Sequence, residues 1–71
     1  MRKKLEKIRK DLGYTQETLA QEIGVKKVTY NHLETGRRDG SIKTWLKIKK
    51  ALGLTSEELV EVIEEGIFLD I

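Results

Sequence analysis

The 71-residue chain contains no cysteine, no proline and only one histidine. Without cysteine it can form neither a disulfide framework nor a thiolate metal site, and one histidine cannot supply a histidine cluster. Long apolar runs are missing too: the longest, residues 67–69, is far too short to span a membrane, and the N-terminal MRKKLEKIRK lacks the apolar region of a signal peptide. We therefore expect a cytoplasmic protein that contacts no membrane and holds no metal or other cofactor.

Charge is distributed unevenly along the chain, although the net charge is only +2. All 14 lysine and arginine side chains lie in residues 1–50, where 6 acidic side chains leave a net charge of +8. Residues 51–71 carry the other 6 acidic side chains and no basic one. Single charges often only solvate the faces of small helices, but that explains the segregation less well. The distribution favours a polyanion as partner of the basic part and a separate role for the acidic part.

Apolar residues recur at helical spacing in five short segments, which predicts an all-α domain with one core. Because proline is absent, we expect glycines to end these helices, at Gly13, Gly24, Gly36 and Gly53 and near Gly66. Expected N-caps are Thr15, Ser41 and Thr55, the last forming a capping box with Glu58.

The helical spacing also predicts which side chains face the core. The expected inward set is Leu5, Ile8, Leu12, Leu19, Ala20, Ile23, Tyr30, Leu33, Ile42, Trp45, Leu46, Ile48, Leu52, Leu59, Val60 and Ile63. The rest of the first helix is expected to expose its basic residues, which are Arg2, Lys3, Lys4, Lys7 and Lys10.

Residues 15–36, TQETLAQEIGVKKVTYNHLETG, carry a family resemblance. Thr15 and Gln16 open one helix, Gly24 stands in a turn, and Leu33 and Glu34 close the next helix before its glycine. This pattern resembles the helix-turn-helix of the phage repressor and Cro-like family, also called the XRE family, and the likeness extends over roughly residues 5–60. It implies a compact five-helix lambda-repressor-like DNA-binding domain over residues 1–65, followed by a short apolar and acidic tail, 66–71.

The resemblance implies where such a protein would touch DNA. In this family the third helix lies in the major groove and the helix before it crosses the backbone. The implied base-contacting residues are Lys27, Val28, Asn31 and His32, and the implied phosphate-contacting residues are Gln16, Lys26, Thr35, Arg37 and Arg38. Lysine can donate to guanine, valine can pack on a thymine methyl group, and histidine can donate to or accept from a base edge. The plainer alternative is that Val28, His32 and the two arginines are ordinary solvated residues.

The family commonly pairs the positions of Arg9 and Glu34 in a partly buried, structural ion pair. Three positions depart from the pattern of this family. Lys26 stands where serine or threonine usually caps the third helix, a loss of ~1 kcal/mol. Gly40 stands where proline is favoured, which predicts a looser loop after that helix. Lys49 occupies a position that is commonly small, so we expect its stem to lie along the core.

The resemblance predicts a sequence-specific, repressor-like transcriptional regulator that binds double-stranded DNA as a homodimer, since paired half-sites lie roughly 34–36 Å apart. Ile67, Phe68 and Leu69 are the expected dimerisation residues; alternatively this segment folds back onto its own core. An enzyme is not expected, because no nucleophile with a nearby base and no phosphate-binding glycine loop is recognisable. The alternative function is a protein-interaction module, such as an antitoxin-like or adaptor subunit, that binds a partner protein through the fifth helix and acidic tail. Repressor and activator roles stay open.

Overall fold

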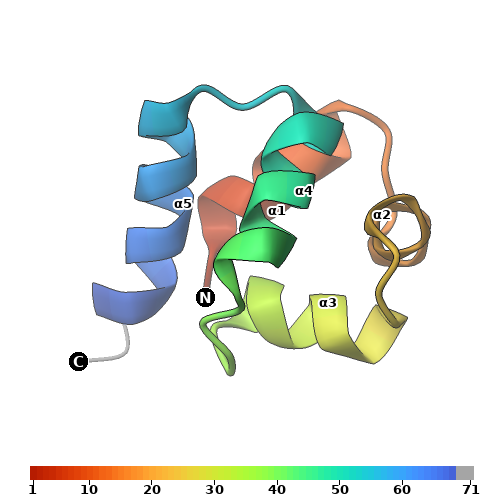
Figure 1. Ribbon diagram of the computed structural model, residues 1–71, viewed down its shortest axis with the longest axis horizontal. Coiled ribbons are helices and arrows are strands. Elements are labelled where there is room, and N and C mark those ends of the chain that lie inside the picture. The colour runs from red at the N-terminus through yellow and green to blue at the C-terminus, as the bar shows by residue number, and fades with distance from the viewer. Residues whose placement is uncertain (69–71) are drawn as a thin grey trace.

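The structure, a computed structural model, describes the backbone of residues 1–68 and the side chains of residues 1–66. Its elements are α1 (Lys3–Asp11), α2 (Gln16–Ile23), α3 (Lys27–Thr35), α4 (Ile42–Leu52) and α5 (Ser56–Phe68) (Figure 1). No strand occurs in this part of the chain, so the predicted five-helix, all-α class is confirmed. Among the described residues, no helix combines the length and the apolar character that crossing a membrane requires.

The helices surround one core and leave α3 at an edge of the molecule (Figure 1). α2 packs against both α3 and α4, while α5 packs against α1, α3 and α4. The buried apolar residues that form this core are Leu5, Leu19, Ala20, Ile23, Tyr30, Leu33, Trp45, Ile48, Leu52, Leu54 and Val62. Each helix contributes at least one of them, so the short helices are stabilised by packing rather than by their own propensity.

Four residues expected in the core are exposed instead: Leu12, Ile42, Leu46 and Val60. Leu12 is the residue after the last turn of α1, so the helical spacing no longer applies to it. In α4 the buried stripe is Trp45, Ile48 and Leu52, and Leu46, one residue from Trp45, points about 100° away from it. Conversely, Leu54 and Val62 are buried although the spacing did not single them out.

Capping fixes most helix boundaries where the sequence predicted them. Thr15 and Ser41 each accept a hydrogen bond from a backbone N–H three residues on, and Thr55 and Glu58 form the reciprocal bonds of a capping box. The backbone hydrogen bond from Thr55 to the Glu58 carboxylate lowers the pKa of Glu58. Gly66 departs from expectation: it lies inside α5, which continues to Phe68, instead of ending the helix.

Candidate nucleic-acid interface

The α2–turn–α3 segment is set by a glycine in the left-handed conformation. Gly24 follows α2 with φ of 74°, a backbone conformation that glycine adopts without steric cost. The next residue, Val25, donates its backbone N–H to the carbonyl of Ala20 at 3.0 Å, and α3 begins two residues later. The sharp turn lets α3 leave at an angle while both helices remain packed on the core.

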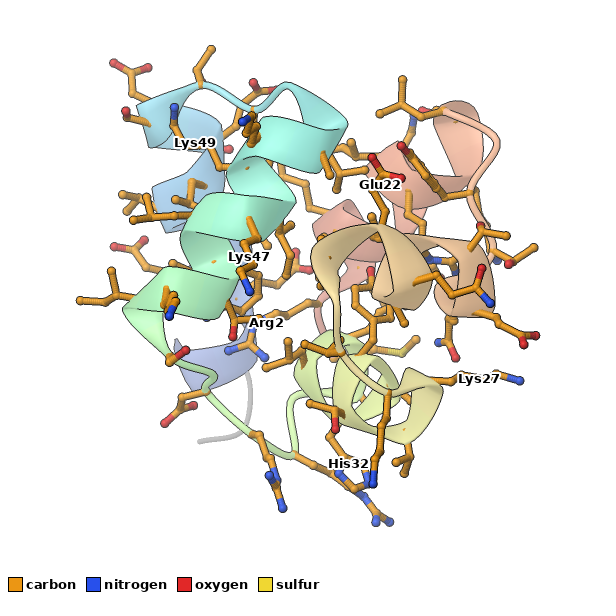
Figure 2. All side chains as sticks on the ribbon, turned by 45° about the vertical axis from the view of Figure 1, so that its right-hand side comes forward. Arg2, Glu22, Lys27, His32, Lys47 and Lys49 are labelled. Carbon is orange, nitrogen blue, oxygen red and sulfur yellow. The ribbon has the colours of Figure 1, made fainter. Side chains whose placement is uncertain are left out.

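α3 has one buried face and one outward face. Tyr30 and Leu33, at 0% and 2% exposure, fasten it to the core, as the sequence predicted. Helical geometry places the four predicted base-contacting residues together on the opposite side: Lys27, Val28, Asn31 and His32. Lys27 and Val28 are exposed, and Asn31 and His32 are half-buried. Figure 2 shows Lys27 and His32 projecting outward from this edge of the molecule.

Lys26 holds the N-cap position of α3 in an extended conformation, and its side chain caps no backbone N–H. The absence of a side-chain cap is what the lysine at this position predicted. The first N–H groups of α3 therefore stay open beside an exposed ammonium, a combination that attracts anions.

Arg9 and Glu34 form a buried ion pair between α1 and α3. The Arg9 Nη2 lies 3.1 Å from one carboxylate oxygen of Glu34, and Arg9 Nε lies 3.2 and 3.3 Å from the two oxygens. The residues are 5% and 0% exposed. Arg9 also donates to the Tyr14 carbonyl at 2.7 Å, which ties the α1–α2 connection to the same pair.

Two of the predicted DNA-contacting residues join this ion pair through amide hydrogen bonds. Gln16 Nε2 donates to Glu34 at 3.0 Å, and Asn31 Nδ2 donates to Gln16 Oε1 at 3.2 Å. The start of α2 is thus connected to the middle of α3 and, through Glu34, to α1. These contacts hold both amides in place at the protein surface.

The Tyr30 hydroxyl is buried close to the same charges. It has no hydrogen-bond partner among the described residues. Burial raises the pKa of Tyr30 well above its usual value, and the negative charge of Glu34 adds to the shift. Tyr30 therefore stays neutral across the physiological pH range.

A shallow surface depression lies at the N-terminus of α2 and collects three basic, two polar and one acidic side chain. It is lined by Arg9, Lys10, Thr15, Gln16, Glu17 and Lys27. Open backbone N–H groups at a helix start, together with nearby cations, suit a phosphate group. These surroundings suit Gln16 to the phosphate contact that the family resemblance implies for it.

The loop of residues 36–41, called here the 36–41 loop, follows α3 and exposes Arg37 and Arg38. It is well fastened: the Arg38 N–H donates to the His32 carbonyl at 3.2 Å, and Trp45 Nε1 donates to the Asp39 carbonyl at 2.5 Å. At Gly40, φ is 75° and a Cβ would lie 2.7 Å from Leu33. The expectation of a looser loop was therefore wrong, because the glycine permits close packing on α3 and α4.

Thr35, another predicted phosphate contact, is half-buried at the last position of α3. Its hydroxyl donates to the Asn31 carbonyl at 2.9 Å, which leaves the oxygen lone pairs and not the proton for a further partner.

Lys49, on α4, is half-buried at the far side of the molecule from Lys27 and His32 (Figure 2).

Arg2 is a basic residue whose exposure the sequence predicted wrongly. It was expected to be one of several solvated cations of α1, but it is 0% exposed and contacts the end of α3, the 36–41 loop and Trp45. A basic residue beside two lysines gives no local sign of burial. The burial of Arg2 follows only from its contacts with residues that are distant in the sequence.

α5 contributes acidic side chains to α1 rather than to the α3 face. Lys4 pairs with Glu61, and the Lys4 backbone N–H donates to Glu65 at 2.8 Å. The hydrogen bond that the Lys4 ammonium donates to the Glu61 carboxylate raises the pKa of Lys4. Of the predicted dimerisation residues, Ile67 and Phe68 lie in the last turn of α5, where their side chains are not described, and Leu69 lies outside the described residues.

A packed helix, a left-handed glycine turn and a second helix with a free outer face define a helix-turn-helix module. The helix-turn-helix family model matches residues 5–59. The chain belongs to this XRE-type family of DNA-binding transcriptional regulators, and is a DNA-binding protein rather than an enzyme. The family resemblance drawn from residues 15–36 is thereby confirmed.

Several relatives match most of the chain. An uncharacterized HTH-type transcriptional regulator of Methanothermobacter thermautotrophicus is 38% identical over 65 residues, covering 92% of this chain and 94% of that protein. Control protein C.MunI of a Mycoplasma species is 38% identical over 63 residues, with 87% and 85% covered. The uncharacterized HTH-type transcriptional regulator YgzD of Bacillus subtilis is 34% identical over 66 residues, with 93% and 100% covered. No solved structure matches the chain.

Proposed function

We propose that this protein binds double-stranded DNA sequence-specifically as a homodimer, with α3 of each copy in the major groove. The observation that carries the proposal is the division of α3 into two faces. Tyr30 and Leu33 hold the helix on the core, while on its other side a lysine and a valine are exposed and an asparagine and a histidine are half-buried. A helix presented in this way fits the width of the major groove.

Lys27 and Val28 carry the first part of base recognition. Both are exposed near the N-terminus of α3, the part of a recognition helix that meets base edges. Lys27 can donate to guanine N7 and O6, and Val28 can cover a thymine methyl group. His32 and the carbonyl of the Asn31 amide add polar contacts one turn further along.

Phosphate contacts position α3 and are assigned to groups on either side of it. Gln16 and Lys26 lie at helix N-termini, where backbone N–H groups favour anions. Arg37 and Arg38 are exposed on the fastened 36–41 loop. The Thr35 hydroxyl, just before the loop, can donate to a phosphate only if it gives up its bond to the Asn31 carbonyl. Their placement before and after the groove-facing helix suits the two phosphate strands that border a major groove.

A second copy is needed because a nine-residue helix can read only a half-site. Exposed apolar residues on two adjacent helices support a self-association surface: Ile42 and Leu46 on α4, and Val60 on α5. The exposed charged residues beside these apolar side chains are basic on α4 and acidic on α5. Lys43, Lys47 and Lys50 accompany the α4 residues, and Glu57, Glu61 and Glu64 accompany Val60. We propose that this surface packs against the second copy, and that the predicted dimerisation residues Ile67, Phe68 and Leu69 take part in the same interface.

Sedimentation of the wild type and of Leu46→Glu tests the dimer. We expect a dimer for the wild type and a folded monomer for the variant, because a carboxylate buried in an apolar interface is strongly unfavourable. Gln21→Glu, which adds a carboxylate at an exposed position of α2 outside this surface, is the control for a surface change. Two dimers of equal stability would contradict this surface.

DNA binding itself is tested by the salt dependence of affinity for a duplex. Each neutralised phosphate should contribute a slope of about −0.9 in log K against log salt concentration. Arg37→Gln should weaken binding and flatten the slope. Lys49→Gln removes the same charge on the far side of the molecule and should leave the slope unchanged (Figure 2). No affinity even at low salt would favour the protein-interaction module.

A further inference from the structure

Arg2 lies at the N-terminal end of α1, where it is enclosed by α3, the 36–41 loop, α4 and α5. Figure 2 shows its guanidinium group inside the molecule, beside α4 and the loop that leads into it. The residue is 0% exposed. A buried arginine is unfavourable unless its charge and its donors are satisfied, so its contacts define what it does.

The first set of contacts holds the C-terminal end of α3. The Arg2 backbone N–H donates to the Glu34 carbonyl at 2.8 Å, and Arg2 Nη1 donates to the Leu33 carbonyl at 2.5 Å. The last carbonyls of a helix lack intrahelical partners and carry partial negative charge, so a cation there is favourable. Arg2 thereby caps the recognition helix at the end away from the turn.

The second set of contacts holds the 36–41 loop. Arg2 Nη1 also donates to the Arg38 carbonyl at 3.0 Å, and Nη2 lies 4.0 Å from the Asp39 carboxylate. One side chain therefore binds both the end of α3 and the backbone of a residue that faces outward as a candidate phosphate contact.

Trp45 and Gly66 form the walls of this site. The Arg2 guanidinium carbon lies 5.0 Å from the centre of the Trp45 ring, within the range of a cation–π interaction. Gly66 leaves the space that the guanidinium fills, since a Cβ there would lie 2.5 Å from Arg2 Nε. The contacts from α4 and α5 fix the direction in which the guanidinium points.

We propose that Arg2 is a positioning residue for DNA binding, which fixes the end of α3 and the 36–41 loop from the buried side so that Arg37 and Arg38 are presented to phosphates. The inference rests on the proposed DNA-binding function. A loop that is already ordered in the free protein loses less conformational entropy when it binds DNA. The two loop arginines therefore contribute more to affinity. Arg2 itself is buried and does not contact the DNA.

The test compares DNA binding by Arg2→Met and by Val62→Ala. Both variants are measured far below their melting temperatures. Val62 is also 0% exposed, but it lies in α5 among apolar residues and serves as a control for lost stability. For a duplex bound by the wild type, Arg2→Met should weaken binding about tenfold and flatten the salt slope by about one phosphate contact per copy. Val62→Ala should change neither. Equal behaviour of the two variants would overturn the proposal.

Hydrogen exchange of the Trp45 indole N–H and the Arg38 backbone N–H gives a readout that needs no DNA. Both groups hydrogen-bond within the 36–41 loop region and should exchange faster in Arg2→Met than in Val62→Ala. Equal exchange in the two variants would show that Arg2 does not fix the loop. If the wild type binds no duplex, the proposed function fails, and this measurement still decides the loop contact.

Arg2→Lys covers the case in which the methionine variant does not fold. Lysine keeps the charge but lacks the planar fork of donors that reaches Leu33 and Arg38 together. The same losses are expected, at smaller size. Wild-type salt slope together with wild-type exchange in this variant would overturn the proposal.

Discussion

The guanidinium of Arg9 and the carboxylate of Glu34 meet 3.1 Å apart in the interior, one from α1 and one from α3. Because Gln16 and Asn31 are hydrogen-bonded onward from Glu34, this pair sets the position of α3 relative to α1 and α2. The ion pair is therefore structural, although it stands directly behind the proposed DNA-binding face.

Glu34→Gln is expected to lower the free energy of unfolding by ~3–5 kcal/mol, because it leaves the Arg9 guanidinium buried without its counter-charge. Urea unfolding measures the loss. A chain of 71 residues has a total stability of only ~4–11 kcal/mol at ordinary values per residue, so the variant is studied at low temperature. Its folded fraction should keep the base preference of the wild type. A stable variant with altered base preference would argue against the structural role.

Gly66→Ala is expected to destabilise the protein, against the usual trend. Alanine in a helix is favoured over glycine by ~1 kcal/mol, so an unconstrained α5 would gain stability. Here the added methyl group meets the Arg2 guanidinium, which must move from its buried partners. Thermal unfolding with Glu64→Ala as a second α5 variant measures the sign, and a raised melting temperature for Gly66→Ala would contradict the packing described.

Tyr30→Phe should remove part of the stability loss at alkaline pH. The pKa of Tyr30 is raised in the folded state above its usual value near 10 in the unfolded chain. Above pH ~10 the unfolded state releases this proton while the folded state keeps it, so stability falls as pH rises. Below that pH both states hold the proton, and the two proteins should differ little, because the hydroxyl has no partner among the described residues.

Urea unfolding of both proteins at pH 8, 10 and 11 isolates the contribution of Tyr30. All other ionisable groups are the same in both proteins, so their effects cancel in the difference between the two curves. The wild type should lose stability relative to Tyr30→Phe as the pH passes ~10. Parallel curves would show that the folded-state pKa of Tyr30 is not raised.

Helix boundaries could be predicted from the sequence because capping is local. Thr15, Ser41 and Thr55 each bond to a residue three positions away, and Gly24 needs only its own backbone conformation. The choice of buried face was less certain. Trp45 and Leu46 are both apolar neighbours, and which of them lies inside depends on where α5 and the 36–41 loop pack.

The candidate site shows the same division between local and long-range information. The residues of the outward α3 face share one short helix, so a family pattern could place them. The burial of Arg2 could not be predicted, because the carbonyls that accept its hydrogen bonds lie 31, 36 and 61 residues away in the chain. They belong to Leu33, Arg38 and Ile63. The tight packing of Gly40 on Leu33 and Trp45 likewise arises only when α3 and α4 come together.

Selection of bound sequences from a random duplex pool tests whether the outward face of α3 reads the base sequence of DNA. The wild type should enrich two inverted half-sites about one helical turn, roughly 10 base pairs, apart. Lys27→Ala should lose preference at one position in each half-site, whereas Lys49→Gln should recover the wild-type site. No enriched sequence, or an unchanged site for Lys27→Ala and Val28→Ala alike, would contradict the account.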